Sequence, residues 1–473
     1  MNPIEISPER FKSLCEQFLA IASDYLTEMD SRSIPAKGSG AEIDRIFRAP
    51  LPDTGLADEA LRAFSDVVQY SRAQNGRFFG YVLGSGETAG AATDVLCSVL
   101  NQNVTAWRSS PAAVTLEKTV VSWLARIVSC REFSGVFCGG GSAANLMGLA
   151  MARETKASAN KSGIPSGPGL AVYASTEVHM SIPKAIALLG IGRDNLRLIP
   201  VDNSFRMIPS QLEQAMLRDT ERGVVPIAVV GSAGTVNTGA IDPLVEIAAI
   251  AAKFGAWFHI DGAYGALGAI AVPHKFPGMD RADSISLDPH KWLYQPIDCG
   301  CLLYRDASAA QRAFSYSGDY VRTLNDDPIE SFTFFDESIE LSRRFRALKL
   351  WFSLRYHGLA AFRKSIENDL EHAQRLGSSI EATTDLQLMA PIELSAVCFR
   401  YVGGTHTASD LDRLNSEILR CVVKRGNVYL SNATLRSRFC LRACVVNHRT
   451  TNSDIDRVVT EVLAVAKEVD SAN

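Results

Sequence analysis

Residues 224–261, VVPIAVVGSAGTVNTGAIDPLVEIAAIAAKFGAWFHID, contain two apolar runs separated by an amphipathic stretch. Short apolar runs bounded by Gly and Pro predict strands that are buried on both faces. Between them, DPLVEIAAIAAKFG repeats apolar residues at helical spacing. A strand, a helix and a second strand in this order predict two parallel strands joined by a helix that covers the sheet.

The same alternation continues over much of the chain. Apolar runs occur at GVFCG (135–139), LAVYAS (170–175), LRLIPV (196–201), VVPIAVVGSAG (224–234), AWFHID (256–261), SISLD (284–288) and CGCLLYR (299–305). Helical patterns such as SAANLMGLAMARE lie between several of them. The pattern predicts an α/β fold with a mostly parallel sheet, in which ligands bind beyond the carboxyl ends of the strands.

The two ends of the chain differ from this central part. Ser7 and Pro8 predict the start of a helix that continues to residue 29, and the Pro-, Gly- and Ser-rich residues 31–55 predict an irregular connector. The C-terminal part mixes helical patterns with short strands such as AVCFRYV, which predicts a smaller α+β domain. We expect three parts: an N-terminal helical segment (1–95), a large domain (96–356) and a small C-terminal α+β domain (357–473).

Composition excludes several classes of protein. The chain has 473 residues, of which 47% are hydrophobic and 21% charged, and its net charge of −4 offers no footprint for nucleic acid. Its ten cysteines lack the spacing of metal ligands. The N-terminus has no signal-peptide pattern, and no apolar run reaches membrane-spanning length. We expect a cytoplasmic protein with reduced thiols, no metal, and no nucleic acid or membrane partner.

Two charged residues stand at the ends of predicted strands. Asp261 ends AWFHID, and Lys291 follows SISLD in DPHKW. Charge at such positions is costly unless it is paired or functional. A lysine and an aspartate that converge there could hold pyridoxal phosphate, with the amine in a Schiff base and the carboxylate facing the pyridine nitrogen. Singly, Asp261 is equally a cap for the next turn, and Lys291 a surface lysine beside Trp292.

A glycine-rich turn and a histidine extend this hypothesis. FCGGGSAAN (137–145) follows a predicted strand and opens a helix, where backbone N–H groups and the helix dipole favour an anion. Ser142 could cap that helix and bind phosphate, although a tight turn with a serine cap needs no ligand. The third glycine of a dinucleotide motif is missing. His179 could stack on a planar cofactor, but a lone histidine is more often structural.

With FHIDGAYGA, DPHKW and GGGSAAN, the chain resembles the group II pyridoxal-phosphate-dependent amino acid decarboxylases. These include aromatic amino acid, glutamate, histidine and sulfinoalanine decarboxylases. The resemblance runs from RFFGYV (77–82) to LRACVVNHRTT (441–451) and so covers most of the chain. It implies the aspartate-aminotransferase type of pyridoxal-phosphate-dependent transferase fold. It also implies a homodimer with active sites at the interface, in which the N-terminal segment contributes to dimerisation.

The resemblance assigns roles to particular residues. It implies decarboxylation of an L-amino acid to the amine and CO2, with Lys291 as the Schiff-base lysine and Asp261 as the partner of the pyridine nitrogen. The implied catalytic residues are Lys291, His179, Asp261 and His290. The same four residues hold the cofactor in this assignment, together with Gly141, Ser142 and Ala263.

The chain departs from the family pattern in the group that returns the proton. Many members use a tyrosine on a loop before the segment LSRRFRALK, but residues 325–338 contain phenylalanine and no tyrosine. Phenylalanine cannot donate a proton. In related aldehyde synthases the same loss leads to aldehyde, ammonia and peroxide, so this outcome is an alternative. His179 and Tyr320 stay open as donors.

The substrate is the second open question. The predicted pocket residues are Tyr81, Asn103, Thr105, Trp107 and Arg442. By alignment, Ala73, Asn103 and Thr105 stand where members with aromatic substrates have larger apolar residues, while Arg442 could bind a carboxylate. An aromatic amino acid is therefore the first choice by a small margin over an acidic or polar one.

Two further observations limit the assignment. Asp288 stands where several relatives have asparagine near the phosphate, and a second negative charge there is unfavourable unless it is paired. An aminotransferase or a cysteine desulfurase would share the fold, and a non-catalytic scaffold protein is a more remote alternative. The strings DGAYG and HK favour the decarboxylase, whereas the missing glycine disfavours a nucleotide-binding dehydrogenase.

Overall fold

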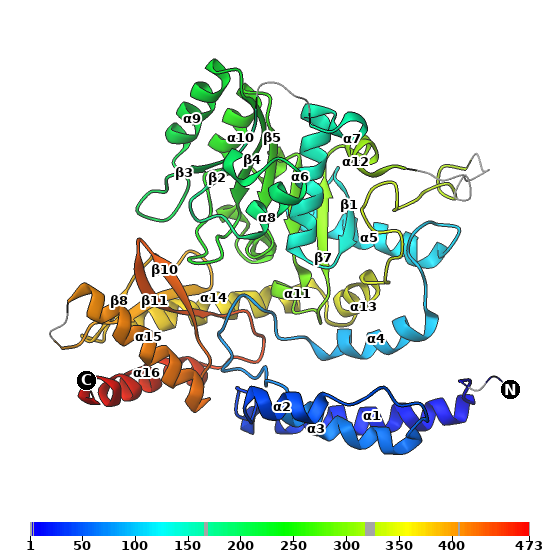
Figure 1. Ribbon diagram of the computed structural model, residues 1–473, viewed down its shortest axis with the longest axis vertical. Helices are drawn as coiled ribbons and strands as arrows, with labels where there is room; N and C mark the ends of the chain where they lie inside the picture. The colour runs from blue at the N-terminus through cyan, green and yellow to red at the C-terminus, as the bar shows by residue number, and fades with distance from the viewer. Residues whose placement is uncertain (1, 3, 165–168, 317–326, 405–406, 473) are drawn as a thin grey trace.

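The computed structural model describes residue 2 and residues 4–164, 169–316, 327–404 and 407–472 (Figure 1). Within these ranges, no helix has both the length and the apolar character that crossing a membrane requires. The strands form two separate sheets, one of seven strands and one of four.

The bounds of the elements follow the chain order. The α-helices are α1 (Pro8–Glu28), α2 (Gly40–Phe47), α3 (Ala63–Tyr70), α4 (Thr88–Leu100), α5 (Pro111–Ile127), α6 (Gly141–Ala157), α7 (Ala159–Ser162), α8 (Ser181–Leu188), α9 (Pro209–Glu221), α10 (Leu244–Lys253), α11 (Pro289–Trp292), α12 (Ala307–Phe314), α13 (Ala347–His357), α14 (Leu359–Glu381), α15 (Ala408–Arg425) and α16 (Asn452–Ala472). The strands are β1 (Ser134–Cys138), β2 (Leu170–Ser175), β3 (Leu196–Ile199), β4 (Val225–Ser232), β5 (Trp257–Asp261), β6 (Ser284–Leu287), β7 (Gly300–Tyr304), β8 (Leu386–Leu388), β9 (Ala396–Tyr401), β10 (Ser431–Leu435) and β11 (Arg438–Cys444).

The larger sheet has the order β1-β7-β6-β5-β4-β2-β3. Strands β6, β5, β4, β2 and β3 are parallel, whereas β7 runs antiparallel to both of its neighbours. The predicted α/β fold with a mostly parallel sheet is thus confirmed. In the register, Asp261 pairs with Ser232 of β4 on one side and with Ser286 of β6 on the other. The carboxyl ends of these central strands therefore meet at one edge.

Alternate residues of the central strands enter two apolar clusters on opposite faces of the sheet. Val229 of β4 belongs to a cluster with residues of α5, α9 and α10. Its neighbours Ala228 and Val230 belong to another cluster, with residues of α6, α8 and α12. Successive side chains of a strand point to opposite faces, so a sheet covered on both sides needs apolar residues throughout. This is why the strands read as unbroken apolar runs.

The smaller sheet is antiparallel, with the order β10-β11-β9-β8. Helices α14 and α15 pack on it, and α16 packs against these two helices. Its apolar core is a third cluster, which includes Val397 and Leu441. Helices α1, α2 and α3 lie together beneath α4, apart from both sheets (Figure 1). None of the residues of α1 is buried.

Two helix boundaries differ from the sequence prediction. The connector predicted at residues 31–55 contains α2, because the Ser39 hydroxyl accepts a hydrogen bond from the Glu42 backbone N–H and starts a helix. The sequence also predicts a helix around residues 341–356, but α13 begins only at Ala347. In the preceding segment, the Arg343 backbone N–H donates to the Asn103 side chain, a contact that competes with helical hydrogen bonding.

Arg343 also forms a fully buried ion pair with Glu117 of α5 and donates to the carbonyl oxygens of Val104 and Phe137. We expect Arg343→Leu to cost about 3–5 kcal/mol, because it leaves the Glu117 carboxylate buried without its partner. Chemical denaturation followed by circular dichroism measures this loss. As a control, Asp456→Ala removes the partner of Arg375 in an exposed pair and should cost less than about 1 kcal/mol. Equal losses in the two variants would contradict the prediction.

Candidate active site

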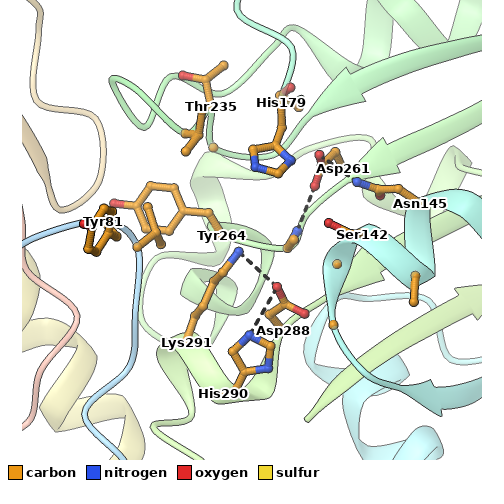
Figure 2. A pocket seen from close by; sticks show the side chains of 18 of the residues that line it. Tyr81, Ser142, Asn145, His179, Thr235, Asp261, Tyr264, Asp288, His290 and Lys291 are labelled. Carbon is orange, nitrogen blue, oxygen red and sulfur yellow. Dashed lines mark hydrogen bonds and ion pairs between the residues drawn. The ribbon is translucent and has the colours of Figure 1, made fainter. Parts of the chain in front are cut away.

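The charged residues predicted at the strand ends meet in one cavity of about 580 Å³ (Figure 2). Of the predicted site residues, the cavity is lined by Tyr81, Gly141, Ser142, His179, Asp261, Ala263, His290, Lys291 and Arg442. They come from segments that are far apart in the sequence. The cavity lies beyond the carboxyl ends of β4, β5 and β6, where a parallel sheet is expected to bind its ligand.

Asp261 is the last residue of β5, and its carboxylate is held by three hydrogen bonds. Oδ1 accepts from the Ala263 backbone N–H at 3.3 Å and from the Ser286 hydroxyl at 3.2 Å. Oδ2 accepts from Nδ2 of Asn145 at 3.0 Å. These donors lie on three different elements, so the carboxylate has one orientation while its residue still lines the cavity.

Lys291 lies on α11, directly after β6, and its side chain extends toward the cavity (Figure 2). Its Nζ is 3.0 Å from Oδ2 of Asp288, which is 2% exposed. The same oxygen is 3.6 Å from Nε2 of His290. The negative charge that the sequence placed at residue 288 is therefore paired. Burial lowers the pKa of His290, and Asp288 opposes this shift.

His179 follows β2, and its Nδ1 is engaged with the start of α8. Nδ1 lies 2.8 Å from the Ser181 hydroxyl and accepts the Ser181 backbone N–H at 3.2 Å. Burial lowers the pKa of His179, although the nearby Asp261 opposes the shift. The ring is therefore neutral at neutral pH, with Nε2 left for the cavity.

The glycine turn brings the backbone close to the cavity. Gly140 has a φ of +145°, which L-residues rarely adopt, and a Cβ on Gly141 would lie 2.6 Å from the Cβ of Ala263. Both positions therefore exclude side chains and leave the first N–H groups of α6 open to an anion. The predicted cap was wrong: Gly140 is the N-cap of α6, and Ser142 lies inside the first turn. Ser142 still lines the cavity.

The predicted substrate residues divide into two groups. Tyr81 is half exposed at the cavity, and Arg442 is buried with hydrogen bonds to the Ser431 hydroxyl and the Val236 carbonyl oxygen. Three others do not line this cavity within the single described chain: Asn103, Thr105 and Trp107. Their local contacts explain this, since the Asn103 side chain accepts from Arg343 and the Trp107 indole donates to Thr115.

The sequence reasoning missed Asn145, Ser286, Thr235 and Tyr264. Asn145 is 1% exposed on α6 and contacts Asp261 directly. Ser286 lies on β6 opposite Asp261. The sequence signal for Asn145 was a polar residue on an otherwise apolar helix face. Asn145 lies four positions after Gly141 and therefore on the same side of α6. Thr235 and Tyr264 line the cavity from loops that follow β4 and β5, where no periodic pattern marks them.

These residues fit pyridoxal phosphate. The glycine turn at the start of α6 offers backbone donors to a phosphate, and Asp261 offers a carboxylate to a ring nitrogen. Lys291 offers an amine to the aldehyde, and His179 offers a flat neutral ring. A cavity of about 580 Å³ lies in the size range of cofactor sites.

Comparisons with known proteins agree with this fit. A family model described as the pyridoxal-dependent decarboxylase conserved domain matches residues 59–402. An aromatic-L-amino-acid decarboxylase of Bacillus atrophaeus is 29% identical over 98% of this chain and 97% of its own length. A phenylacetaldehyde synthase of Petunia hybrida is 29% identical over 93% of this chain and 91% of its own length.

A solved structure of Oryza sativa TDC with PLP and tryptamine is similar over 99% of both chains, with a TM-score of 0.93 and 27% identity. This likeness confirms the transferase fold that the sequence resemblance implied. The family model covers well over half of the 473 residues. The chain therefore belongs to the pyridoxal-dependent decarboxylase family and is an amino acid decarboxylase that depends on pyridoxal phosphate.

Proposed function

We propose that the enzyme converts an aromatic L-amino acid to the corresponding amine and CO2, with Lys291 and Asp261 as its central catalytic residues. The observation that carries the catalytic assignment is the convergence of Lys291, Asp261 and the glycine turn on one cavity. The aromatic preference is supported by the relative from Bacillus atrophaeus and by the rings of Tyr81 and Tyr264 in the cavity lining.

Each residue of the cavity has a proposed role that follows from its position. When bound, pyridoxal phosphate supplies an electron sink for the electron pair that remains on the substrate Cα after CO2 leaves. Lys291 would hold the cofactor through its amine, and Asp261 would offer the ring nitrogen a carboxylate that is fixed by three donors. His179 and Ala263 would hold the ring, and Gly141 and Ser142 would bind the phosphate. His290 would orient the segment that carries Lys291.

The second candidate is an aldehyde synthase, favoured by the segment before α13. Of the residues described there, 327–338, none is a tyrosine, and Phe334 is fully buried beneath the Arg343 guanidinium. Tyr320 lies outside the described residues. The relative from Petunia hybrida is a phenylacetaldehyde synthase. A decarboxylase of an acidic or polar amino acid is the remaining candidate, since Arg442 brings a guanidinium to the cavity.

We also propose a homodimer in which residues 1–95 contribute to the interface, joined to a large domain (96–356) and a small domain (357–473). The support is apolar surface on α1, where Phe11, Phe18, Leu19 and Leu26 are all exposed. An amphipathic helix with no buried residue needs a partner for its apolar face. Asn103, Thr105 and Trp107 can reach a substrate pocket only from the second chain of such a dimer.

The assignment of Lys291 predicts the effect of Lys291→Ala. We expect turnover to fall by at least about a thousandfold, because Lys291 would form the covalent link to the cofactor. Catalytic residues that act together lose most of their effect when one of them is removed. The visible absorbance band of the lysine-bound cofactor should disappear as well. Lys275→Ala, which removes an amine paired with Glu393 instead, is the control and should keep both signals. Retention of the band and of steady turnover in Lys291→Ala would refute the assignment.

A panel of L-amino acids tests the substrate and the reaction together. With the pure enzyme, CO2, amine, ammonia and peroxide should be measured in the same samples. We expect amine and CO2 in equal amounts from an aromatic amino acid, without peroxide. Equal amounts of peroxide and ammonia would instead identify an aldehyde synthase, and turnover confined to acidic amino acids would sink the aromatic preference.

The dimer proposal predicts the outcome of changing the apolar face of α1. Phe18→Glu together with Leu26→Glu should convert a dimer into a monomer in sedimentation velocity experiments, because each buried carboxylate would be unpaired. Lys12→Glu changes charge on the same helix at an already polar position and should leave the dimer intact. A wild-type chain that sediments as a monomer at micromolar concentration would rule the dimer out.

A further inference from the structure

A buried chain of hydrogen bonds leads from the cofactor residues into the body of the large sheet. Its central member is Asn145, which donates to Oδ2 of Asp261 at 3.0 Å and to the Ser181 hydroxyl at 2.9 Å. Oδ1 of Asn145 lies 2.9 Å from Nε2 of His259. Asn145 is 1% exposed, Ser181 2% and His259 fully buried, so water does not compete for these contacts.

The hydrogen on His259 follows from the two residues that contact its ring nitrogens, Ser284 and Asn145. Nδ1 of His259 lies 2.8 Å from the Ser284 hydroxyl, whose oxygen accepts the Trp257 indole N–H at 2.8 Å. The Ser284 hydroxyl can either donate to Nδ1 or accept from it, so the tautomer is decided at Nε2. Nε2 must donate to Oδ1 of Asn145, because Nδ2 of that amide donates to the Asp261 carboxylate. Burial lowers the pKa of His259, so the ring is neutral and carries its single hydrogen on Nε2. That hydrogen points at Oδ1 of Asn145.

The Asp261 carboxylate fixes the amide of Asn145, and His259 complements this orientation. With Oδ1 facing Nε2–H, the two hydrogens of Nδ2 are directed at Asp261 and at Ser181. The flipped amide would place its oxygen 3.0 Å from the Asp261 carboxylate, with two acceptors facing each other in a site that excludes water. The observed orientation is thus the one in which every member of the chain has a partner.

The same hydrogen bonds determine which ring nitrogen of His179 carries the hydrogen. The Ser181 oxygen accepts from Asn145, so the Ser181 hydroxyl hydrogen is free to donate to Nδ1 of His179. The Ser181 backbone N–H donates to that nitrogen too. With two donors at Nδ1, a neutral His179 carries its hydrogen on Nε2. The charged groups that act on this ring are Asp261, Lys291, Asp288 and Lys184.

A glycine in α6 makes room for this arrangement. A Cβ on Gly148 would lie 2.7 Å from both Cε1 and Nδ1 of His259 and 3.1 Å from the Ser284 hydroxyl. Glycine inside a helix costs about 1 kcal/mol relative to alanine. Its presence here is explained by the imidazole that lies against the helix at this point.

We propose that Asn145, hydrogen-bonded to His259, is a positioning residue that fixes the Asp261 carboxylate and helps to hold His179 in the tautomer with its hydrogen on Nε2, facing the cavity. The inference rests on the roles proposed above for Asp261 and His179. Asn145 contacts Asp261 directly and reaches His179 through the Ser181 hydroxyl, so it acts through these two residues. Through these contacts, the Asn145 amide fixes the orientation of the Asp261 carboxylate. It also helps to keep the hydrogen of His179 on Nε2, which faces the cavity.

The tautomers can be measured directly. In the full-length protein labelled with 15N-histidine, long-range 1H–15N correlation spectra distinguish Nδ1–H from Nε2–H, and the eight histidines of the chain can be assigned by single substitution. We expect both His179 and His259 to carry hydrogen on Nε2. Hydrogen on Nδ1 of either ring would overturn the inference, whether or not the protein decarboxylates any amino acid.

A matched pair of variants tests Asn145 itself. Asn145→Asp keeps the shape and the acceptor for His259 but replaces the donor to Asp261 by an oxygen. We expect pyridoxal phosphate, titrated into cofactor-free protein and followed by absorbance, to bind at least about tenfold more weakly. Asn415→Asp is the control, because Asn415 is a fully buried amide in the small domain with equally complete hydrogen bonding.

The two variants separate positioning from stability. Both should lower the melting temperature, but only Asn145→Asp should weaken cofactor binding. Equal weakening in both would show that Asn145 has a structural role alone and would overturn the inference. If binding and tautomers behave as expected while no amino acid loses CO2, the proposed function fails and the positioning role stands.

Discussion

The Asp261 carboxylate is a charge at the end of a buried strand, and the surrounding structure is arranged to hold it. A carboxylate in such a place is tolerated only when donors replace the water it has lost. The donors come from the loop after β5, from the neighbouring strand β6 and from helix α6. Because the three elements meet only when the sheet order is correct, the charge at Asp261 depends on the whole fold.

The charge of Lys291 is compensated too, but by a neighbouring carboxylate. Lys291 and Asp288 lie three positions apart around one turn of α11 and compensate each other's charge. Oδ1 of Asp288 has no hydrogen-bond partner among the described residues, and it lies beside the glycine turn. A buried oxygen without a donor is unfavourable in a structure built only for stability. The Asp288 carboxylate is thus paired through Oδ2, while Oδ1 has no donor among the described residues.

Much of the fold was predictable because its signals are local and periodic. The seven apolar runs of the large sheet all became strands, since burial on both faces requires an unbroken apolar sequence. The convergence of Asp261 and Lys291 on one cavity was predictable for the same reason, because both residues stand at the ends of these runs. The sequence did not indicate that β7 is antiparallel, because strand direction depends on how a connection crosses the sheet. Ser142 was misplaced as a cap because Gly140 can occupy that position with a φ closed to other residues.

The residues predicted for the substrate pocket differ from those predicted for the cofactor in how the fold spaces them. The cofactor half is built at the edge of one sheet, where neighbouring strands fix the spacing of their own end residues. The substrate half has no such frame: Tyr81 lies on a loop with a positive φ, and Arg442 comes from the second sheet. Asn103, Thr105 and Trp107 do not line the cavity of their own chain. The residues predicted for the cofactor are thus spaced by one sheet, whereas those predicted for the substrate come from segments that no common element spaces.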